Sequence, residues 1–568
     1  MYRPFYSGVA AALAGTAILI GLGYSAALVE PTHPPIQRMS VDAGGREAND
    51  DSSEQFISRD GRYVVFTSQA ENLVPGDSNG FADVFLVDRV SGTIEKVSTG
   101  DDESQLNGNS EEGMVSADGR FAVFGSYASN AVVNDRNATW DIFVRDRQAG
   151  TTERVSVSGA EAETNDSSAF PSISADGRYV AFHSWAGNLV AGDTNAVADM
   201  FVRDRQAGTT ERVSLSGSEG QGNGHSQSGY ISDDARYVGF YSFANNLVAS
   251  DTNNTNDVFL RDRTTGTTER ISVSSAGAQG NNQSQLSAMS PDSRFIVFSS
   301  SASNLVTGDN NTAMDVFVRD RLTSVTERVS VPWPGLPPEA LPSQGGSISA
   351  NGRFVTFWST NTYLVPGDTN LKPDVFLRDR QLSTTERVNL NTNGGQSVGG
   401  GSWGPFITAD GTEIVFSSLA SDLVEGDTNS VQDIFLRTGD GDGDSVPDED
   451  DNCPAWPNSS QALPSWPVPA NDPDCDGLDD STESHLGTDP ARQCPATSVL
   501  NDEPVDAWPA DFNDNRLTNL TDVSLIALVY NRPTGTDPAM QRFDLNASGT
   551  ISLPDVALMG PFYNKPCS

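Results

Sequence analysis

Two loops near the end of the chain have the residue types and spacing of calcium sites. They read DGDGDSVPDEDD (440–451) and DPDCDGLDDSTE (472–483), and each places acidic side chains at positions 1, 3, 5, 9 and 12. These are the side-chain ligand positions of a twelve-residue EF-type loop, and carboxylate oxygens in this number suit Ca²⁺. A solvated acidic linker is the alternative, although it would rarely repeat the spacing. The predicted ligands are Asp440, Asp442, Asp444, Asp448, Asp451 and the carbonyl of Val446 in the first loop, and Asp472, Asp474, Asp476, Asp480 and Glu483 in the second.

A second pair of loops, DFNDNRLTNLTD and DLNASGTISLPD, repeats the spacing with fewer charged groups. Each is followed by a short apolar run at helical spacing, VSLIALVYN and VALMGPFY. Because fewer carboxylates would face the ion, we expect weaker calcium binding here than in the 440–451 loop. The predicted ligands are Asp511, Asn513, Asn515, Asn519 and Asp522 in one loop and Asp544, Asn546, Ser548, Ser552 and Asp555 in the other.

The four loops resemble two known calcium modules. The first is followed by NCP and the second by LGTDP; both resemble thrombospondin type 3 repeats, which implies a calcium-binding stalk over residues 439–494. The second pair, with its helices, resembles a dockerin over residues 507–566, which implies a dockerin-like, EF-hand-type module at 495–568 and a cohesin-like partner. Dockerins use loop positions 10 and 11 to recognise a cohesin. Here these are Leu520-Thr521 and Leu553-Pro554, so the cohesin partner stays an open question.

The acidic tail that carries these loops needs cations to fold. From Thr438 onward it holds 23 acidic and 5 basic residues, and such like charge keeps a chain expanded unless it is neutralised. Ca²⁺ is therefore the predicted cofactor. All four cysteines also lie in the tail, and four cysteines allow three pairings. One of the three, Cys453 with Cys475 and Cys494 with Cys567, would close two small modules separately.

Charge and the N-terminal segment indicate an exported protein. The net charge is -41 with a pI of about 4.2, so the surface repels nucleic acid and anionic lipid, and neither is an expected partner. Residues 1–29 contain Arg3 followed by an apolar run, which predicts a secretory signal peptide, although the length also fits an uncleaved membrane anchor. Both alternatives make the chain secreted or attached to the cell surface, and only an uncleaved segment would contact a membrane.

The elements that must position any site come from a repeat that is written seven times. Each unit has an Asp-Gly turn or a variant of it, an aromatic strand, a GDTN-type loop, DVF(V/L)RDR and TTERVS. The turns and the β-branched content predict four strands per unit and no helix in this region. Four strands per unit are the blade of a β-propeller. The loop aspartates recur every 58 or 59 residues, at Asp77, Asp135, Asp193, Asp251, Asp309, Asp368 and Asp427.

The ends of the array predict a closed ring over residues 36–438. The chain supplies IQRMSV (36–41) before the first unit, and the seventh unit lacks a fourth strand after DIFLR (433–437). We expect the N-terminal strand to complete the seventh blade and remove an exposed edge. The predicted fold is thus a mainly β, seven-bladed propeller of four-stranded blades. Segments such as ISRDGRYVVF and ISADGRYVAF resemble the WD40-like PD40 repeats of TolB-type propellers, which implies the fold but no particular activity.

The loop between the second and third strands has two interpretations. Asp193, Asn195 and Asp199 have counterparts in every blade, which fits one calcium site per blade. Asx-turns use the same residues without a metal. The aspartate of the RDR motif, Asp204, cannot close such a site, because five residues of extended strand, at about 3.3 Å each, separate it from Asp199.

No catalytic constellation emerges from the sequence. GGSWG (400–404) matches the G-x-S-x-G nucleophile elbow, but that motif requires a following helix, and a serine equivalent to Ser402 stands in every unit. We therefore interpret Ser402 as scaffold. His183 lies on a predicted strand, and no second histidine shares metal spacing with it, so zinc chemistry is not expected.

The predicted function is recognition or scaffolding by a secreted or cell-surface protein. Its ligand, a protein or a glycan, is expected at the central channel or on the polar loops before each blade, such as QGNGHSQSG and QGNNQSQ. The apolar loop WPGLPPEALP (333–342) is a candidate protein contact. A glycosidase or polysaccharide lyase is one alternative, which would require charged groups clustered at the channel mouth. A purely structural envelope or matrix protein is the other.

Overall fold

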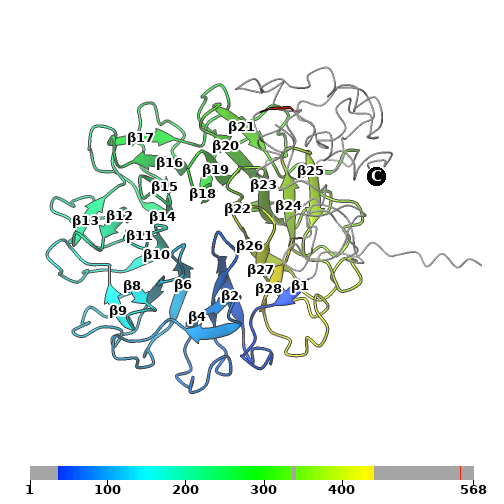
Figure 1. The fold of residues 1–568 in the computed structure, drawn as a ribbon. Coiled ribbons are helices and arrows are strands. Elements are labelled where there is room, and N and C mark those ends of the chain that lie inside the picture. The colour runs from blue at the N-terminus through cyan, green and yellow to red at the C-terminus, as the bar shows by residue number, and fades with distance from the viewer. Residues whose placement is uncertain (1–35, 312, 336–340, 440–549, 552–568) are drawn as a thin grey trace, which may run out of the picture.

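The computed structural model describes residues 36–311, 313–335, 341–439 and 550–551. Within them the chain forms seven four-stranded antiparallel sheets, which stand as blades around a central axis (Figure 1). The described part of the chain contains no helix, and hence none long and apolar enough to cross a membrane. The prediction of a mainly β, seven-bladed propeller is confirmed for this part.

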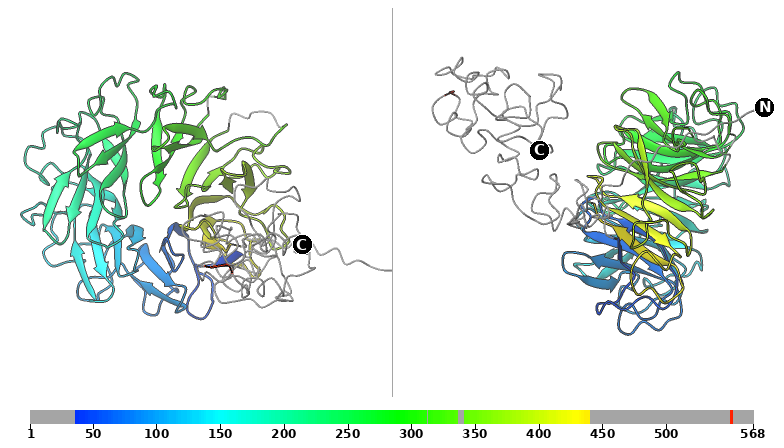
Figure 2. Two further views of the ribbon diagram at one scale, coloured as in Figure 1. Left: turned by 45° about the horizontal axis from the view of Figure 1, so that its top comes forward. Right: turned by 90° about the vertical axis from the view of Figure 1, so that its right-hand side faces the viewer.

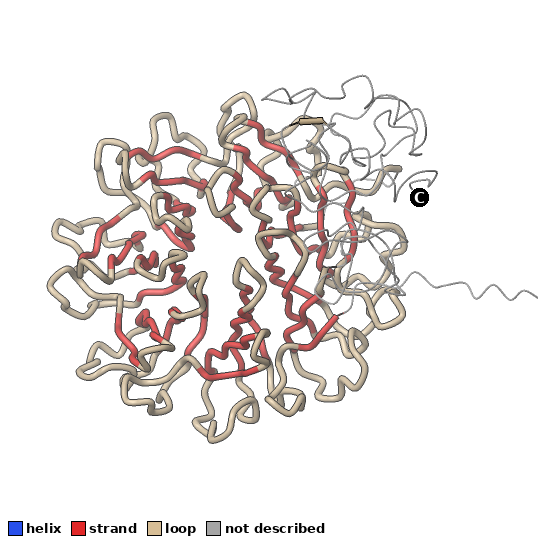
Figure 3. The backbone as a smooth tube through the Cα atoms, viewed as in Figure 1, coloured by secondary structure: helices blue, strands red, loops and turns tan. Residues whose placement is uncertain are grey.

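The strands of each blade are arranged from the central channel outward (Figure 3), and the first two of them form its inner half. Pairing proceeds outward in chain order, as β2-β3-β4-β5 in blade 1. The first strands, which line the channel, are β2 (Ser52–Ile57), β6 (Ser110–Val115), β10 (Ser168–Ile173), β14 (Ser226–Ile231), β18 (Ser284–Met289), β22 (Ser343–Ile348) and β26 (Ser402–Ile407). The second strands are β3 (Tyr63–Ser68), β7 (Phe121–Ser126), β11 (Tyr179–Ser184), β15 (Tyr237–Ser242), β19 (Phe295–Ser300), β23 (Phe354–Ser359) and β27 (Ile414–Ser418).

The outer half of each blade is formed by the DVF(V/L)RDR and TTER segments. The third strands are β4 (Asp83–Asp88), β8 (Asp141–Asp146), β12 (Asp199–Asp204), β16 (Asp257–Asp262), β20 (Asp315–Asp320), β24 (Asp374–Asp379) and β28 (Asp433–Arg437). The fourth strands are β5 (Thr93–Lys96), β9 (Thr151–Arg154), β13 (Thr209–Arg212), β17 (Thr267–Arg270), β21 (Val325–Arg328), β25 (Thr384–Arg387) and, in blade 7, β1 (Ile36–Arg38).

The ring is closed by the first strand of the chain, as predicted. β1 pairs antiparallel with β28, with Ile36 opposite Arg437 and Arg38 opposite Phe435. In Figure 1 the blue β1 lies beside the yellow β28, and the side view in Figure 2 shows the blue and yellow blades as neighbours. The strand covers 36–38 rather than 36–41, although the N–H of Met39 still donates to the carbonyl of Ile434 at 2.7 Å. Closure leaves β28 without a free edge.

Each blade is held internally by a stacked pair of phenylalanines. One comes from the second strand and the other from the DVF motif directly opposite on the third, as Phe182 and Phe201 in blade 3. Their ring centroids lie 6.1 Å apart, and the equivalent pair recurs in all seven blades. Both rings of such a pair are buried. They pack against the preceding blade, as Phe182 and Phe201 do with Val144 of blade 2, so the repeated strand pattern builds seven equivalent cores between neighbouring blades.

Neighbouring blades are joined by an aromatic ring between two arginines. In blade 1, the guanidinium group of Arg62 lies 4.9 Å from the ring centroid of Tyr63, and that of Arg147 in blade 2 lies 5.4 Å from it. Gly119 in the next Asp-Gly turn makes room for this ring, since a Cβ there would lie 2.1 Å from it. Phe121, Tyr179, Tyr237 and Phe295 each contact two arginines in the same way.

Candidate functional site

The residues predicted to bind calcium in the tail lie outside the described part of the chain. The loops 440–451, 472–483 and 511–522 fall there completely, and of the loop 544–555 only Thr550 and Ile551 are described. The four cysteines and the segment 1–29 also lie outside it. These assignments therefore stay predictions.

The loops between the second and third strands of each blade, which we call the blade loops, lie within the described residues. Their aspartates bind a basic side chain. In blade 3, Nη1 of Arg212 lies 3.2 Å from Oδ1 of Asp193 and 3.0 Å from Oδ2 of Asp199. Asn195 and Ser214 donate to the two oxygens of Asp199, at 2.8 Å and 2.6 Å. The equivalent cations in the other blades are Lys96, Arg154, Arg270, Arg328, Arg387 and, from β1, Arg38.

The cation of the fourth strand thus takes the place that a metal ion would need in each blade loop. Burial raises the pKa of Asp199, while the hydrogen bonds from Ser214 and Asn195 and the charge of Arg212 lower it. Among the described residues, no group of three or more His, Cys, Asp or Glu side chains is arranged to hold a metal. The geometry favours an ion-paired structural turn over a calcium site. The arginine was missed in the sequence because it lies 19 residues after Asp193, on another strand.

The serine of the GGSWG motif is a scaffold residue. Ser402 donates its hydroxyl to that of Ser418 at 2.9 Å, which ties the first strand of blade 7 to the second. Strand β26, rather than a helix, begins at Ser402. The same hydroxyl pair occurs in every other blade.

The first strands of all seven blades line a channel. Phe56 and Phe406 meet edge to face in it, with ring centroids 5.6 Å apart, and Tyr230 also lines it. At the end that carries the Asp-Gly turns, Arg59 of blade 1 reaches Asp233 of blade 4 at 2.8 Å. A cavity of about 180 Å³ lies at the opposite end, which we call the mouth. The polar loops before each blade lead into the first strands at this end.

A β-bulge in the first strand shapes the mouth. In blade 1 the register to the second strand shifts between Ser53 and Phe56, and the bulged residue has a left-handed φ. Non-glycine residues held in this region are strained and cluster at functional sites, and bulges re-aim side chains. The bulged residues of the first four blades, all of which line the mouth, are Glu54 (φ 53°), Glu112 (φ 62°), Phe170 (φ 52°) and Ser228 (φ 45°).

Three glutamates gather where blades 1 and 2 meet the mouth. Oε2 of Glu54 accepts hydrogen bonds from the N–H of Glu112 at 2.9 Å and from the hydroxyl of Thr67 at 3.0 Å. Oε2 of Glu112 accepts from the N–H of Phe170 in blade 3 at 2.6 Å. Desolvation raises the pKa of Glu112 to about 7; the Phe170 N–H opposes this shift, and the charges of Glu54 and Glu111 add to it. Desolvation and the charge of Glu54 also raise the pKa of Glu111.

Aromatic rings flank the glutamates. Phe170 is 50% exposed and stacks on His183, with ring centroids 5.3 Å apart. Burial lowers the pKa of His183 to about 4, so this imidazole is neutral at physiological pH, and its Nδ1 accepts from the N–H of Ser228 at 3.4 Å. Burial raises the pKa of Tyr230 to about 12, so its hydroxyl stays protonated. The mouth therefore combines anionic oxygens with neutral aromatic faces.

A buried amide oxygen also lies in the wall of the mouth. Gln55 is only 3% exposed, and its amide nitrogen donates to the carbonyls of Trp403 and Gly404. Its Oε1 receives no hydrogen bond from any described residue, although buried acceptors normally have a donor. The described residues that line the mouth include no Lys, Arg or His. As far as the described residues go, the site is thus rich in acceptors and holds no positive charge.

The sequence predicts a ligand site in the channel or on the polar loops before each blade, but it does not single out these residues. The variation at the bulge position is a signal that could have pointed to them, since the scaffold positions of the repeat hardly vary. The residues at this position are Glu54, Glu112, Phe170 and Ser228 in the first four blades and Gly404 in the seventh. The bulge itself is not visible in a strand pattern. It moves the third residue of the strand out of the alternation on which that pattern depends.

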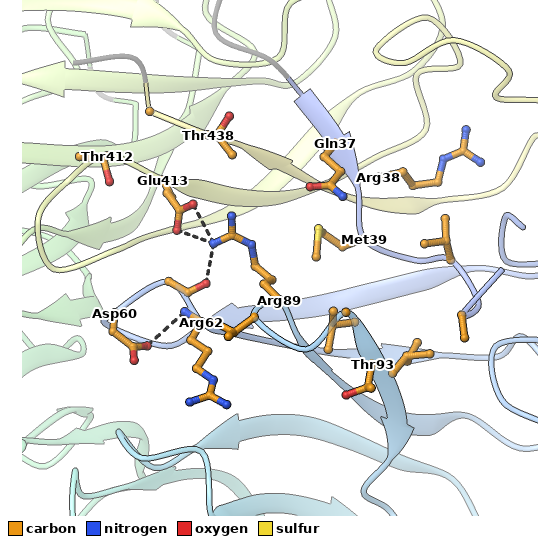
Figure 4. A pocket seen from close by; sticks show the side chains of 18 of the residues that line it. Gln37, Arg38, Met39, Asp60, Arg62, Arg89, Thr93, Thr412, Glu413 and Thr438 are labelled. Carbon is orange, nitrogen blue, oxygen red and sulfur yellow. Dashed lines mark hydrogen bonds and ion pairs between the residues drawn. The ribbon is translucent and has the colours of Figure 1, made fainter. Parts of the chain in front are cut away.

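A larger cavity, of about 700 Å³, lies at the junction between blades 7 and 1 (Figure 4). Blade 7 has Thr412 and Glu413 where blade 6 has Arg353 and Phe354, so this junction lacks the aromatic ring of the other repeats. Its three arginines are ion-paired within the propeller, with partners that neutralise them. The pairs are Arg38 with Glu47, Arg62 with Asp88 and Arg89 with Glu413. The mouth, with uncompensated charge, is the better candidate site.

Comparisons with known proteins concern the fold. No protein-family model and no curated protein matches the chain. A prolyl endopeptidase structure matches at 12% identity with a TM-score of 0.42; the match covers 66% of this chain but only 46% of that one. A putative TolB from Agrobacterium tumefaciens matches at 16% and 0.31, over 51% of this chain and 95% of that one. The propeller domain of the Trilobed protease from Pyrococcus furiosus matches at 9% and 0.40, over 68% and 95%.

Proposed function

We propose that this chain is a recognition or scaffold protein whose propeller binds a protein or polysaccharide ligand at the mouth. The observation that carries the proposal is the convergence of Glu54, Glu112 and Phe170, from three blades, on one end of the channel. Concave sites with a few polar groups set among aromatic side chains are the usual form of binding sites. The strained bulges point to the same place.

The tail supplies attachment in this proposal. The loops in 439–494 form a stalk that Ca²⁺ makes rigid, and residues 495–568 form a calcium-dependent module for which a cohesin-like protein is the candidate partner. The ligand spacing of the four loops supports the calcium sites. The apolar segment at residues 1–29 supports secretion or display on the cell surface.

The test is a binding screen of the full chain against glycan and peptide arrays, with and without Ca²⁺. The matched variants are Glu54→Gln with Glu112→Gln, which remove the charges and retain acceptors, and Glu425→Gln, on an exposed loop of blade 7. We expect a ligand whose binding the first variant abolishes and the second leaves unchanged. No ligand in either array, or binding that both variants retain, would reject the mouth and favour a structural envelope or matrix role.

A second candidate is a polysaccharide-active enzyme, either a glycosidase or a lyase. The observation in its favour is the pKa of Glu112, which desolvation and the charge of Glu54 raise to about 7, because glycoside hydrolysis uses a carboxyl group with a raised pKa as its acid and a second carboxyl group nearby. Release of reducing ends or of unsaturated sugars from a polysaccharide panel, lost in Glu112→Gln, would establish this activity. Turnover that persists in Glu112→Gln would exclude Glu112 as the catalytic acid.

A further inference from the structure

We propose that the mouth binds the ammonium or guanidinium group of a Lys or Arg side chain presented by a partner peptide. This inference rests on the proposed function, in which the mouth is a ligand site, and specifies the chemistry of the ligand. It arises from the charge, the size and the unpaired acceptor of the cavity.

The charge of the mouth favours a cation. Glu54 and Glu112 line the cavity and Glu111 is close enough for its charge to act on Glu112, while none of the described lining residues is basic. A cation placed among them would relieve the repulsion and offset the cost of desolvating the carboxylates. The net charge of -41 would also steer cations towards the molecule.

The walls of the mouth suit a side chain with both a charge and an apolar stem. Phe170 presents an exposed ring and Phe56, Met114 and Tyr230 line the interior. Ammonium and guanidinium groups bind favourably over aromatic faces, and the methylene stems of Lys and Arg pack on apolar surface. Gln55 lines the same cavity, and its Oε1 is buried without a donor among the described residues; a cationic group that entered beside it, with a rotation of the amide, would supply the missing N–H.

The size of the mouth argues for a single side chain. The cavity measures about 180 Å³, whereas sites that enclose a whole small molecule measure about 300–1,000 Å³. A neutral sugar would leave the carboxylate charges uncompensated, and an anionic polysaccharide would be repelled by them. A divalent metal is disfavoured, since the described carboxylates form no group of three that is arranged to hold one.

The experiment is isothermal titration of the full chain with capped tripeptides, Ac-Gly-Arg-Gly-NH₂ and Ac-Gly-Lys-Gly-NH₂, against Ac-Gly-citrulline-Gly-NH₂. Citrulline has nearly the shape of arginine but no charge. Because citrulline cannot form charge-assisted hydrogen bonds to the carboxylates, we expect the citrulline peptide to bind at least about tenfold more weakly. Glu112→Gln should weaken the two cationic peptides by a similar factor and Glu425→Gln should not. If Glu112→Gln fails to fold, Glu111→Gln takes its place.

The outcomes separate this inference from the function on which it rests. Equal affinity for the arginine and citrulline peptides, or cationic binding that the glutamate variants do not change, would overturn the cationic specificity. Putrescine that binds as tightly as the peptides would replace the peptide with a free polyamine as the ligand. A glycan that binds at the mouth and is not displaced by the arginine peptide would preserve the proposed function and reject this inference. Failure of every ligand would reject both.

Discussion

Arg89 of blade 1 donates to the carboxylate of Glu413 in blade 7 at 2.8 Å, across the point where the ring closes. At the five junctions between blades 1 and 6, such as that of Arg147 with Glu95 and Tyr63, the arginine binds a glutamate of the fourth strand and stacks on an aromatic ring. At the closure Gln37 stands at the position of that glutamate. It lies opposite Leu436 of β28, as Glu386 lies opposite Leu377 in blade 6. The carboxylate has moved to the position of the ring, so the ion pair is retained and the ring is lost.

Restoring the repeat at this junction should stabilise the ring. In blades 1 to 6 the arginine that follows the Asp-Gly or variant turn binds the aspartate of the RDR motif, as Arg353 binds Asp379 at 2.8 Å. In blade 7 Thr412 stands in place of the arginine and Thr438 in place of the aspartate. We expect Thr412→Arg with Thr438→Asp to show a favourable coupling energy of about 0.2–1 kcal/mol, typical of exposed ion pairs. A double-mutant cycle by urea unfolding measures it. Purely additive single effects would show that the new pair does not form.

Removal of β1 should open the ring. A chain that begins at Ala43 loses the pairing with β28, the buried hydrogen bond from Ser40 to Asp433 at 2.5 Å, and the cation beside Asp433. Because this leaves a buried carboxylate unpaired, we expect the free energy of unfolding, measured with urea, to fall by at least about 3 kcal/mol. Because it also exposes the edge of β28, we expect self-association, which light scattering detects. A chain that begins at Glu30 is the control, and equal behaviour of the two chains would contradict closure by β1.

The blade-loop ion pair should contribute more to stability than a surface pair of the same type. Arg212→Met leaves Asp193 and Asp199 buried without their cation, so we expect a loss of about 3–5 kcal/mol in the free energy of unfolding. Arg46→Met breaks a pair with Asp42 in which the arginine side chain is 77% exposed, and should cost at most about 1 kcal/mol. If the two variants lose equal stability, the blade-loop pair is not a buried one.

The stability of the propeller should depend on Glu112 between pH 5 and pH 8. The folded pKa is about 7, above the ordinary value of 4.5, so the contribution is fully present below 4.5 and is lost as the pH rises through 7. Wild type should therefore lose more stability over this range than Glu112→Gln, by on the order of 2 kcal/mol. Glu54 and Glu111 also face this group, so their glutamine variants are measured alongside. Parallel pH profiles for wild type and Glu112→Gln would contradict the raised pKa.

Chelation of calcium should act on the tail and leave the blades unchanged. We expect EDTA to increase hydrogen exchange in residues 440–568 and not in 36–439, because cations of the protein already neutralise the blade-loop aspartates. Asp440→Asn with Asp472→Asn should lower the number of bound Ca²⁺ ions measured by titration, whereas Asp193→Asn should not. If Asp193→Asn does lower the number of bound Ca²⁺ ions, the blade loops bind calcium and the ion-paired interpretation is wrong.

The number of blades, the strand order and the closure could all be predicted from the sequence. Each follows from signals within one repeat unit, such as the spacing of Asp193 and Asp251, the alternation in DMFVRDR and the missing fourth strand after Arg437. Ladder hydrogen bonding and the burial of Phe182 against Phe201 act between neighbouring strands. Such local forces are expressed in local patterns.

The composition of the mouth and the cation in each blade loop required the folded ring. Glu54, Glu112 and Phe170 lie one repeat apart along the chain and become neighbours because the blades turn around a common axis. Arg212 reaches Asp193 only after the outer strands have paired. The left-handed bulge that directs Glu54 into the mouth is imposed by packing, against the residue's own preference. Convergence and strain of this kind depend on contacts between blades, and a linear pattern does not contain them.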